Sequence, residues 1–550
     1  MRFLLPRLAV AAWVAGFSLL PLPGSASDTP ERARVTILAT TDLHGRVFPI
    51  NYGTNQPAAE GLARVATLVR AARKEVPDLL LVDCGDTIQG TPLAYYHNRI
   101  NNGPIDPMML AMNALGYTSM TLGNHEYNFG LPVLHKARGE ARFPWLSANT
   151  LRSGTDEPAF TPYVVREVAG VRVGILGLTT PAIPSWESPA NFAGLTFIDP
   201  VASATRWVEV LRQQEKVDVV VATVHFGLNQ NLADGRTPPG EMENENPTLT
   251  LAREVPGIDL MFLAHTHQDV AGLSVNGVLI SQAGRWGSRL ARGDVYLERP
   301  NRSAPWRVLA KASTTLPVTL ATTPDPELLD LVRPYHEATQ TWLSQPVGRS
   351  AIALSSREAR LRDSAIIDLI HRVQLDSGKA DISFAAAFTL DATLPAGDVT
   401  VRDLAGLYIY ENTLVVIELT GAEVKDALEH AAGYFRAYQP GLTPAELVDP
   451  AIPGYNFDTA EGVEYTLDLR RPRGDRVVDL RFGGAPIDPN RRFRVAINNY
   501  RLNGGGGYRM FRNARVVDQA NQEIRELMID WVRRNPEIPS APTGNWRLLP

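Results

Sequence analysis

The stretch that most constrains the fold is a short apolar run, residues 117–120, which leads into Thr121-Leu122-Gly123-Asn124-His125-Glu126. An apolar run that stops at Gly-Asn-His indicates a buried strand that ends in a turn. The turn presents a neutral oxygen ligand and an imidazole next to each other. Alone this is a modest signal, because a single histidine is more often a hydrogen-bonded structural residue than a ligand.

Four other apolar runs of the chain end in side chains of the same kind. They are Asp42 and His44 after residues 35–39, Asp86 after residues 79–82, His225 after residues 217–224, and His265 and His267 after residues 258–263. Helical spacing of apolar residues at 61–75 and 108–115 places helices between these strands. Alternating strands and helices predict an α/β layered fold, with its site at the carboxyl ends of the strands.

The candidate ligands offer only carboxylate or amide oxygen and imidazole nitrogen. This set suits Zn²⁺, Mn²⁺, Mg²⁺ or a similar ion and argues against Cu(I) and iron–sulfur centres. Seven ligands are more than one tetrahedral ion uses, whereas two ions that share a carboxylate use them all. In Asp42-x-His44 and His265-x-His267, an extended backbone would direct both side chains to one side. Two ions about 3.5–4 Å apart stabilise a displacement at phosphorus and lower the pKa of bound water to about 7.

The length of the chain, 550 residues, indicates two domains. Residues 325–343 have helical spacing, and a second α/β pattern follows them. We therefore expect a catalytic domain at residues 28–324, a connector helix at 325–346, a second domain at 347–534 and a tail at 535–550.

The first residues have the composition of an export signal. Arg2 and Arg7 precede or flank an uncharged apolar run at residues 8–20, and Ser25-Ala26-Ser27 offers a cleavage site. The run is too short to span a bilayer comfortably, so we expect cleavage near Ser27 and no membrane anchor afterwards. A net charge of −5 does not indicate a surface that binds nucleic acid polymers.

The motifs as a set support a resemblance to a known family. Asp-x-His, Gly-Asp, Gly-Asn-His-Glu, a later His and Ala-His-x-His, in that order, resemble the calcineurin-like metallophosphoesterases. With its second domain the chain is similar to the exported nucleotidases of that family. The resemblance implies an α/β fold, a layered metallophosphoesterase β-sandwich with flanking helices, followed by a second α/β nucleotide-binding domain. It also implies periplasmic location, two divalent ions (zinc, manganese, cobalt or magnesium) and small-molecule nucleotides as substrates.

The resemblance also implies roles for single residues. One ion would be held by Asp42, His44, Asp86 and His267, and the other by Asp86, Asn124, His225 and His265. His125 would bind no metal and would stabilise the transition state or assist the leaving oxygen. The family stacks the nucleobase between two aromatic rings, for which Tyr410 and Tyr500 are the candidates. Asn124 and Asn412 would make further polar contacts with the substrate.

A few positions separate the branches of this family. Asn128, three residues after His125, stands where 5′-nucleotidases have an aspartate, and Gly506 also replaces an aspartate of that branch. Residues 384–389 contain no arginine, so the bidentate phosphate clamp of 5′-nucleotidases is missing. Residues 85–92 resemble the loop of the cyclic phosphodiesterases. These differences favour a 2′,3′-cyclic-nucleotide 2′-phosphodiesterase/3′-nucleotidase, in which hydroxide activated by the two metals attacks phosphorus.

Two alternatives remain open. The chain could be a 5′-nucleotidase or nucleotide-sugar hydrolase, which a comparison of substrates would separate from the first hypothesis. It could instead be a surface or binding protein that kept the fold and lost the activity, although its complete ligand set argues against this. A sulfur-oxidation hydrolase with the same architecture is less favoured. No feature of the sequence predicts an oligomeric state.

Overall fold

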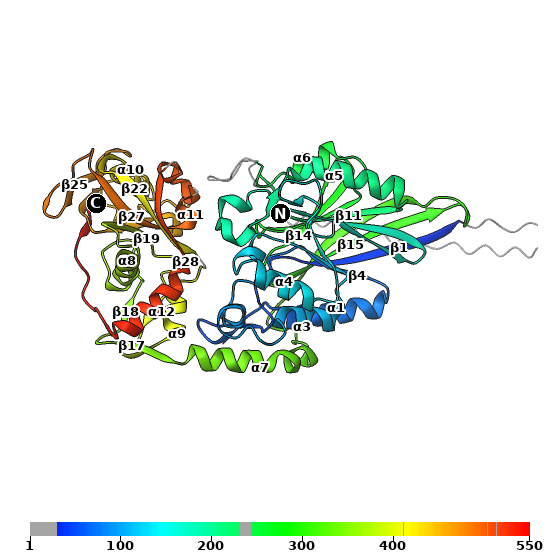
Figure 1. Ribbon diagram of the computed structural model, residues 1–550, viewed down its shortest axis with the longest axis horizontal. Helices are drawn as coiled ribbons and strands as arrows, with labels where there is room; N and C mark the ends of the chain where they lie inside the picture. Colours follow the sequence, from blue (N-terminus) through cyan, green and yellow to red (C-terminus); the bar gives the residue numbers. More distant parts are fainter. Residues whose placement is uncertain (1–29, 231–243, 411, 503, 513, 550) are drawn as a thin grey trace, which may run out of the picture.

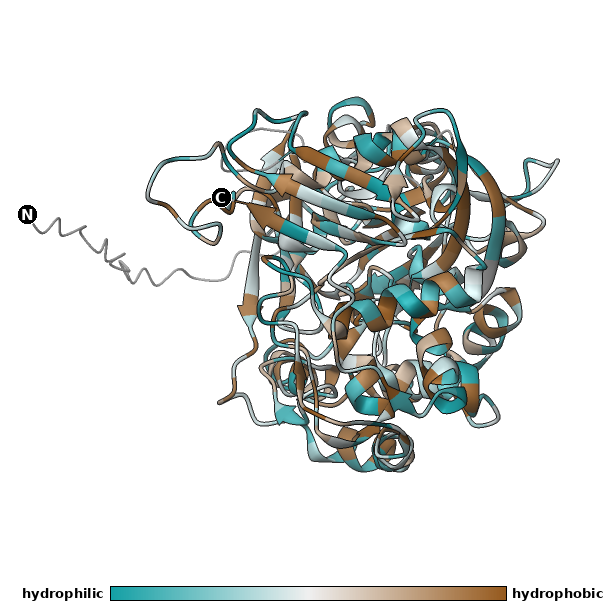
Figure 2. Cartoon of the chain, turned by 90° about the vertical axis from the view of Figure 1, so that its left-hand side faces the viewer, coloured by the Kyte–Doolittle hydropathy of each residue, from teal (hydrophilic) through white to brown (hydrophobic). Residues whose placement is uncertain are grey.

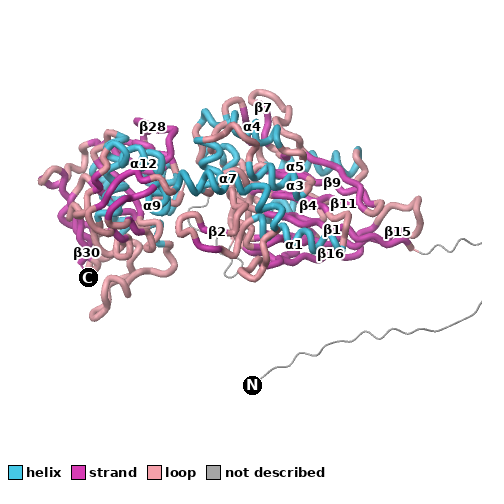
Figure 3. Tube along the Cα trace, turned by 90° about the horizontal axis from the view of Figure 1, so that it is seen from below, coloured by secondary structure: helices cyan, strands magenta, loops and turns pink. Residues whose placement is uncertain are grey.

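The structure is a computed structural model that describes residues 30–230, 244–410, 412–502, 504–512 and 514–549. The predicted signal peptide, residues 1–27, lies outside the described residues. Two domains lie side by side, and helix α7 (Pro326–Leu343) leads from the N-terminal to the C-terminal domain (Figures 1 and 3). Among the described residues, no helix has the length and apolar character needed to cross a membrane.

The N-terminal domain contains two six-stranded sheets. The first has the order β16 (Arg307–Pro317), β15 (Arg289–Arg299), β1 (Glu31–Thr40), β4 (Leu80–Asp83), β5 (Ser119–Thr121) and β6 (Trp145–Leu146). The second has the order β13 (Asp269–Val275), β14 (Val278–Ala283), β12 (Leu260–Leu263), β11 (Val219–His225), β9 (Val171–Thr179) and β8 (Tyr163–Val168). Strands β1, β4, β5 and β6 run parallel, as do β9, β11, β12 and β14.

The two sheets pack face to face, and helices cover their outer faces. Successive residues of a strand point to opposite faces: Ile37 of β1 lies between the sheets and Leu38 packs against helices. The helices on the first sheet are α1 (Leu62–Glu75), α3 (Pro107–Leu115) and α4 (Leu131–Glu140), and those on the second are α5 (Pro200–Glu209) and α6 (Thr248–Glu254). These four layers confirm the predicted β-sandwich with flanking helices.

Local sequence sets where the helices begin and end. In α3 the side chain of Asp106 accepts hydrogen bonds from the backbone N–H groups of Met108 and Met109, and Pro107 occupies the first turn. The helix ends at Gly116, whose φ of 65° is left-handed. Asp325 caps α7 in the same way as Asp106 caps α3, by accepting from Leu328 N. The helices predicted at 61–75, 108–115 and 325–343 are therefore present.

The C-terminal domain is built on a five-stranded sheet. Its order is β23 (Asp458–Glu461), β19 (Ile382–Ala386), β27 (Arg492–Asn498), β22 (Thr413–Thr420) and β28 (Arg515–Glu523). Helices α8 (Ala365–Gly378), α9 (Val401–Leu407) and α12 (Ile524–Arg534) belong to one hydrophobic cluster, and α10 (Gly421–Ala432) belongs to another. Figure 2 shows helices with both hydrophobic and hydrophilic residues, as expected for helices with one packed side.

The last residues do not form a separate tail, in contrast to the expectation for 535–550. Strand β29 (Glu537–Ile538) pairs with β17 (Pro346–Ser350), and β30 (Trp546–Leu549) pairs with β24 (Glu464–Asp468). The physical reason is burial: Trp546 stacks on Tyr465 and packs edge-on against Phe457. The end of the chain is thereby part of the C-terminal domain.

The two domains also share a hydrophobic cluster. Tyr52 and Tyr95 of the N-terminal domain belong to the same buried cluster as Trp342 of α7 and Met528 of α12. Tyr95 stacks on Trp342 at a ring-centroid distance of 5.6 Å. This packing fixes the C-terminal domain against the connector helix.

Candidate metal centre

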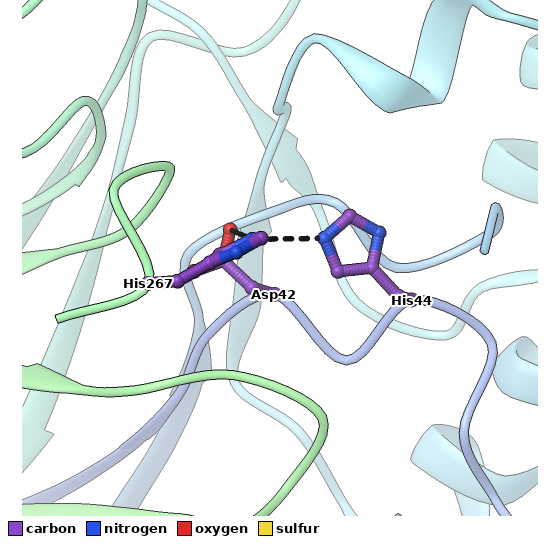
Figure 4. A group of neighbouring side chains, drawn as sticks. All are labelled: Asp42, His44 and His267. Atoms are coloured by element: carbon purple, nitrogen blue, oxygen red, sulfur yellow. Dashed lines mark hydrogen bonds and ion pairs between the residues drawn. The ribbon is translucent and has the colours of Figure 1, made fainter. Parts of the chain in front are cut away.

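The loops after β1 and β12 bring together the first group of candidate ligands, Asp42, His44 and His267 (Figure 4). Nε2 of His44 and Nε2 of His267 are 3.2 Å apart, and Nε2 of His267 lies 3.4 Å from Oδ1 of Asp42. Asp42 is fully buried. Three residues from two distant parts of the chain thus face one point.

A second group, Asp86, His225 and His265, lies beside the first. Nε2 of His225 is 3.0 Å from Oδ2 of Asp86, and Oδ1 of Asn124 lies 3.1 Å from Nε2 of His225 and 3.0 Å from Nδ1 of His265. The same Asp86 oxygen is 3.9 Å from Nε2 of His44. The carboxylate of Asp86 therefore faces both groups, and all seven predicted ligands meet at one edge of the sandwich.

The backbone of these loops is not extended, which corrects the expectation for the two X-x-His motifs. Asp42 and His44 have φ angles of 48° and 49°, His265 and His267 have 71° and 57°, and Asp86 has 58°. Left-handed conformations cost about 1–2 kcal/mol for residues with a side chain. The ligands converge because each loop turns back on itself at its ligand residues, not because alternate side chains share a face.

Two glycines allow the loops after β4 and β5 to touch. A Cβ atom on Gly123 would lie 2.2 Å from Oδ1 of Asp86, and one on Gly85, whose φ is 97°, would lie 2.5 Å from the backbone N of Gly123. No side chain fits at either position. The carboxylate of Asp86 can therefore reach the centre because the neighbouring loop has no side chain at Gly123.

Glu126, the last residue of the Gly-Asn-His-Glu motif, ties the same two loops together. Its Oε2 accepts from the backbone N of Asp86 at 2.8 Å and of Gly123 at 2.6 Å. Its Oε1 accepts from the backbone N of Thr87 at 2.6 Å and of Ile88 at 3.3 Å. Glu126 is fully buried, and through these backbone hydrogen bonds it holds the loop that carries Asp86 in place.

Burial and ion pairing oppose each other at Asp86 and His225. Burial would raise the pKa of Asp86, but the imidazoles of His225 and His125 hold it well below its usual range. Burial would lower the pKa of His225, but the carboxylates of Asp86 and Asp42 raise it to about 10. Burial prevails at His44 and lowers its pKa to about 3. The buried carboxylates of the centre thus favour positive charge beside them, which a divalent cation supplies when bound.

The donor atoms fit a pair of divalent cations. Within each group the candidate ligand atoms all lie within 4.8 Å of one another. Imidazole nitrogen, carboxylate and amide oxygen are the ligands that zinc, manganese and similar ions take in proteins. A carboxylate such as Asp86, placed between two groups, is also the ligand that a pair of ions can share.

His125 lies at the rim of the centre. Its side chain is 36% exposed, and its Nε2 is 4.0 Å from Oδ2 of Asp86. Its Nδ1 lies 2.6 Å from Oδ1 of Asn128. Asn128, a position at which the sequence departs from the 5′-nucleotidase pattern, therefore contacts the imidazole directly.

The C-terminal domain presents the predicted aromatic residues at its surface. Tyr410 is 41% and Tyr500 is 40% exposed. A third tyrosine of this domain, Tyr455, is 39% exposed, and sequence reasoning missed it because it lies in a long loop rich in Pro and Gly. Asn412 precedes β22, and its carbonyl oxygen accepts a hydrogen bond from Ile524 N.

Two residues of the N-terminal domain that sequence reasoning missed contact the ligands. Oε1 of Glu245 lies 3.0 Å from Nε2 of His265, and Nη1 of Arg285 lies 3.2 Å from Nδ1 of His267. Next to Tyr500, Nδ2 of Asn499 donates to the backbone carbonyl of Trp186, whose ring lies 5.3 Å from that of His265. The segment that carries Tyr500 therefore lies close to the metal centre of the other domain.

Comparison with known proteins decides the family. A model described as calcineurin-like phosphoesterase matches residues 35–269, and one described as 5′-nucleotidase, C-terminal domain, matches residues 346–513. The 2′,3′-cyclic-nucleotide 2′-phosphodiesterase/3′-nucleotidase of Salmonella typhimurium is 31% identical, over 96% of this chain and 90% of that protein. The chain belongs to the calcineurin-like phosphoesterases that carry a 5′-nucleotidase C-terminal domain.

Two further relatives of this phosphoesterase extend the comparison. The Haemophilus influenzae protein of the same name as the Salmonella relative is 32% identical, over 94% of this chain and 87% of its own. The solved structure of a candidate 5′-nucleotidase from Staphylococcus aureus superposes with a TM-score of 0.79 and 26% identity, covering 94% of this chain and all of that one. The phosphoesterase is accordingly a metal-dependent hydrolase that uses two divalent ions, and the two ligand groups are where this chain can hold them.

Proposed function

We propose that this phosphoesterase hydrolyses 2′,3′-cyclic nucleotides to 3′-nucleotides, and 3′-nucleotides to nucleoside and phosphate. The observation that carries the proposal is the contact between Asn128 and His125, at 2.6 Å. Asn128 is the residue at which the sequence departs from the 5′-nucleotidase pattern, and it lies against the imidazole proposed to handle the proton. Two relatives that are 31% and 32% identical bear this activity in their names.

The proposed ligands follow the two groups of the structure. One ion is assigned to Asp42, His44, Asp86 and His267, and the other to Asp86, Asn124, His225 and His265. When bound, the ions supply an activated water and positive charge for the phosphoryl oxygens. Asp86 keeps the two groups together, and Glu126 keeps Asp86 in place through the backbone.

Side chains of the protein are assigned the proton transfer to the leaving oxygen and the binding of the nucleotide. His125 holds a proton at Nε2 for the leaving oxygen of the ester, since this nitrogen lies on the side of Asp86. Tyr410 and Tyr500 stack on the nucleobase, which contributes about 1–3 kcal/mol per base and tolerates any base. Asn124 and Asn412 are assigned polar contacts with the substrate.

The segment that binds phosphate in 5′-nucleotidases is occupied differently in this chain. Residues 384–389 begin in β19 and continue beyond its end, where the carbonyl groups of Ala387 and Phe388 accept hydrogen bonds from the guanidinium of Arg360. This arrangement supports the proposal, because residues 384–389 contain no arginine and the neighbouring Arg360 directs Nε and Nη2 to these backbone carbonyl groups.

Turnover of three substrates tests the proposal. Purified protein loaded with Mn²⁺, Zn²⁺ or Co²⁺ is expected to hydrolyse 2′,3′-cyclic AMP and 3′-AMP far faster than 5′-AMP, and a chelator is expected to abolish all three activities. A clear preference for 5′-AMP would instead support the 5′-nucleotidase alternative, which the C-terminal domain model and the Staphylococcus aureus structure favour. Absence of turnover with every ion and substrate would support a binding protein that retained the fold.

We also propose that the protein is exported to the periplasm and carries no membrane anchor there. The apolar run at residues 8–20 and the small residues at 25–27 support this. Fractionation of cells that produce the full chain is expected to place the enzyme in the periplasmic fraction, with an N-terminus close to residue 28. Recovery with the membranes would contradict the proposal.

A further inference from the structure

A carboxylate that has no part in the proposed mechanism lies behind His125. Glu187 stands between two 3₁₀ turns, Ile183–Ser185 and Pro189–Phe192, which follow β9. Its Oε2 accepts a hydrogen bond of 2.6 Å from Nδ2 of Asn128. Its Oε1 accepts from the backbone N of Ser188 at 2.9 Å and from Nδ2 of Asn191 at 3.0 Å. N–H donors thus hold both oxygens, and one donor is the neighbour of His125.

The bond to Glu187 determines which end of the Asn128 amide faces His125. An asparagine amide has one oxygen, which accepts, and one NH₂ group, which donates. Because a carboxylate only accepts, the NH₂ group must face Glu187, and this leaves Oδ1 towards the imidazole. Nδ1 of His125 lies 2.6 Å from that oxygen. Since the oxygen only accepts, Nδ1 carries the hydrogen.

Proton exchange is then confined to the other ring nitrogen. Nε2 of His125 lies on the side of the metal ligands, 4.0 Å from Oδ2 of Asp86. With Nδ1 protonated in both the neutral and the charged ring, only Nε2 gains or loses a proton. The imidazolium can pass its Nε2 proton to the oxygen that leaves phosphorus, and the ring remains neutral with its hydrogen on Nδ1.

We propose that Glu187 is a positioning residue, which acts through Asn128 to hold His125 in the tautomer that carries hydrogen on Nδ1. This inference rests on the proposed role of His125. An asparagine that is free to turn next to a catalytic imidazole can stabilise the wrong tautomer and lower turnover strongly. Glu187 prevents this turn, and it places a negative charge one residue beyond the imidazole. An imidazole–amide–carboxylate series therefore stands where the 5′-nucleotidase pattern has an aspartate three residues after the histidine.

Exchange of the two side chains tests the series. Glu187→Gln leaves an amide that can offer either end to Asn128, so Asn128 can turn its NH₂ group towards His125. Asn128→Asp alone sets two carboxylates within hydrogen-bond distance, which disfavours the charge on both. The double variant Asn128→Asp/Glu187→Gln restores a complete series, because the carboxylate at position 128 accepts from His125 and from the amide at position 187.

The experiment compares these three variants with the wild type and with Glu167→Gln, a matched change at an exposed position of β8. The kcat and KM for 3′-AMP and for 4-nitrophenyl phosphate are measured, together with bound metal and the thermal unfolding midpoint. Glu187→Gln is expected to lower kcat on 3′-AMP about 10- to 100-fold, with KM within about threefold of the wild type. The loss is expected to be smaller on 4-nitrophenyl phosphate, because nitrophenolate leaves with little need of a proton.

The double variant shows whether Glu187 orients His125 through Asn128 or only stabilises the loop that contains it. Recovery of kcat by about tenfold or more over Asn128→Asp alone supports the series, and it can be read even where Glu187→Gln does not fold. Losses that simply multiply in the double variant, or a Glu187→Gln defect confined to KM, bound metal or the unfolding midpoint, would overturn the proposal. If the wild type prefers 5′-AMP, the proposed function fails, and the same comparison on 5′-AMP still tests Glu187.

Discussion

Replacement of Glu126 by Gln is expected to destabilise the N-terminal domain more than a single lost charge would suggest. The carboxylate accepts four backbone N–H groups, two at each oxygen. A glutamine keeps one oxygen, so its NH₂ group must face the other pair of N–H donors. Each buried N–H group left without an acceptor costs about 1–3 kcal/mol. The expected loss in the free energy of unfolding is therefore about 4 kcal/mol, and Glu126→Ala, which removes all four bonds, should lose more.

Denaturant unfolding of the metal-free protein measures this loss, because bound ions would add their own stabilisation to the folded state. Glu167→Gln, an exposed substitution in the same domain, should change the free energy of unfolding by less than about 0.5 kcal/mol. A Glu126→Gln protein within about 1 kcal/mol of the wild type would refute the reasoning, since it would show that the four N–H groups find other partners.

Three further outcomes are expected. His125→Ala should lower kcat by about 10²-fold or more while bound metal, measured by atomic absorption, stays unchanged, and loss of metal would mean that His125 is a ligand. Tyr410→Ala and Tyr500→Ala should each raise KM for nucleotides about 5- to 100-fold with little effect on kcat, and unchanged KM values would remove them from the base site. Burial raises the pKa of Asp368 to about 8, above the value of about 3.9 in the unfolded chain. The contribution of Asp368 to stability is therefore fully present below about pH 4 and is lost as the pH rises to about 8. Asp368→Asn should therefore reduce the fall in unfolding midpoint between pH 5 and pH 9, and an unchanged fall would exclude Asp368 as its source.

The layered fold could be predicted because local sequence patterns indicate its strands and helices. The strand predicted at residues 35–39 lies within β1, and that at 258–263 contains β12, since both are apolar runs buried on two faces. Helix α7 was predictable from the apolar spacing of residues 325–343 and from Asp325 at its start. The end of the chain was not, because β29 and β30 are short and acquire their structure only by pairing with distant strands.

The candidate ligands could be predicted because parallel strands end at a common edge. The residue types at the strand ends, from Asp42 to His267, were sufficient to predict that these seven side chains share one site, and the structure brings them together. The sequence did not reveal how their side chains converge. Pattern reasoning assigns an extended backbone to Asp-x-His and His-x-His, whereas the structure gives left-handed φ angles to both residues of each motif. Such conformations arise from contacts between loops, which no local pattern contains.

Glu126 could be recognised as important from the sequence and Glu187 could not, because only Glu126 lies in a recognisable motif. Glu126 belongs to the Gly-Asn-His-Glu motif, so its importance could be suspected although its four backbone partners could not. Glu187 lies 59 residues from Asn128, in a loop without any strand-end signal, and only the folded chain brings their side chains to 2.6 Å. Asn128 taken alone suggests that His125 has lost its carboxylate. The structure instead places a carboxylate one residue further out, so this chain, which has asparagine at position 128, keeps a carboxylate behind its imidazole.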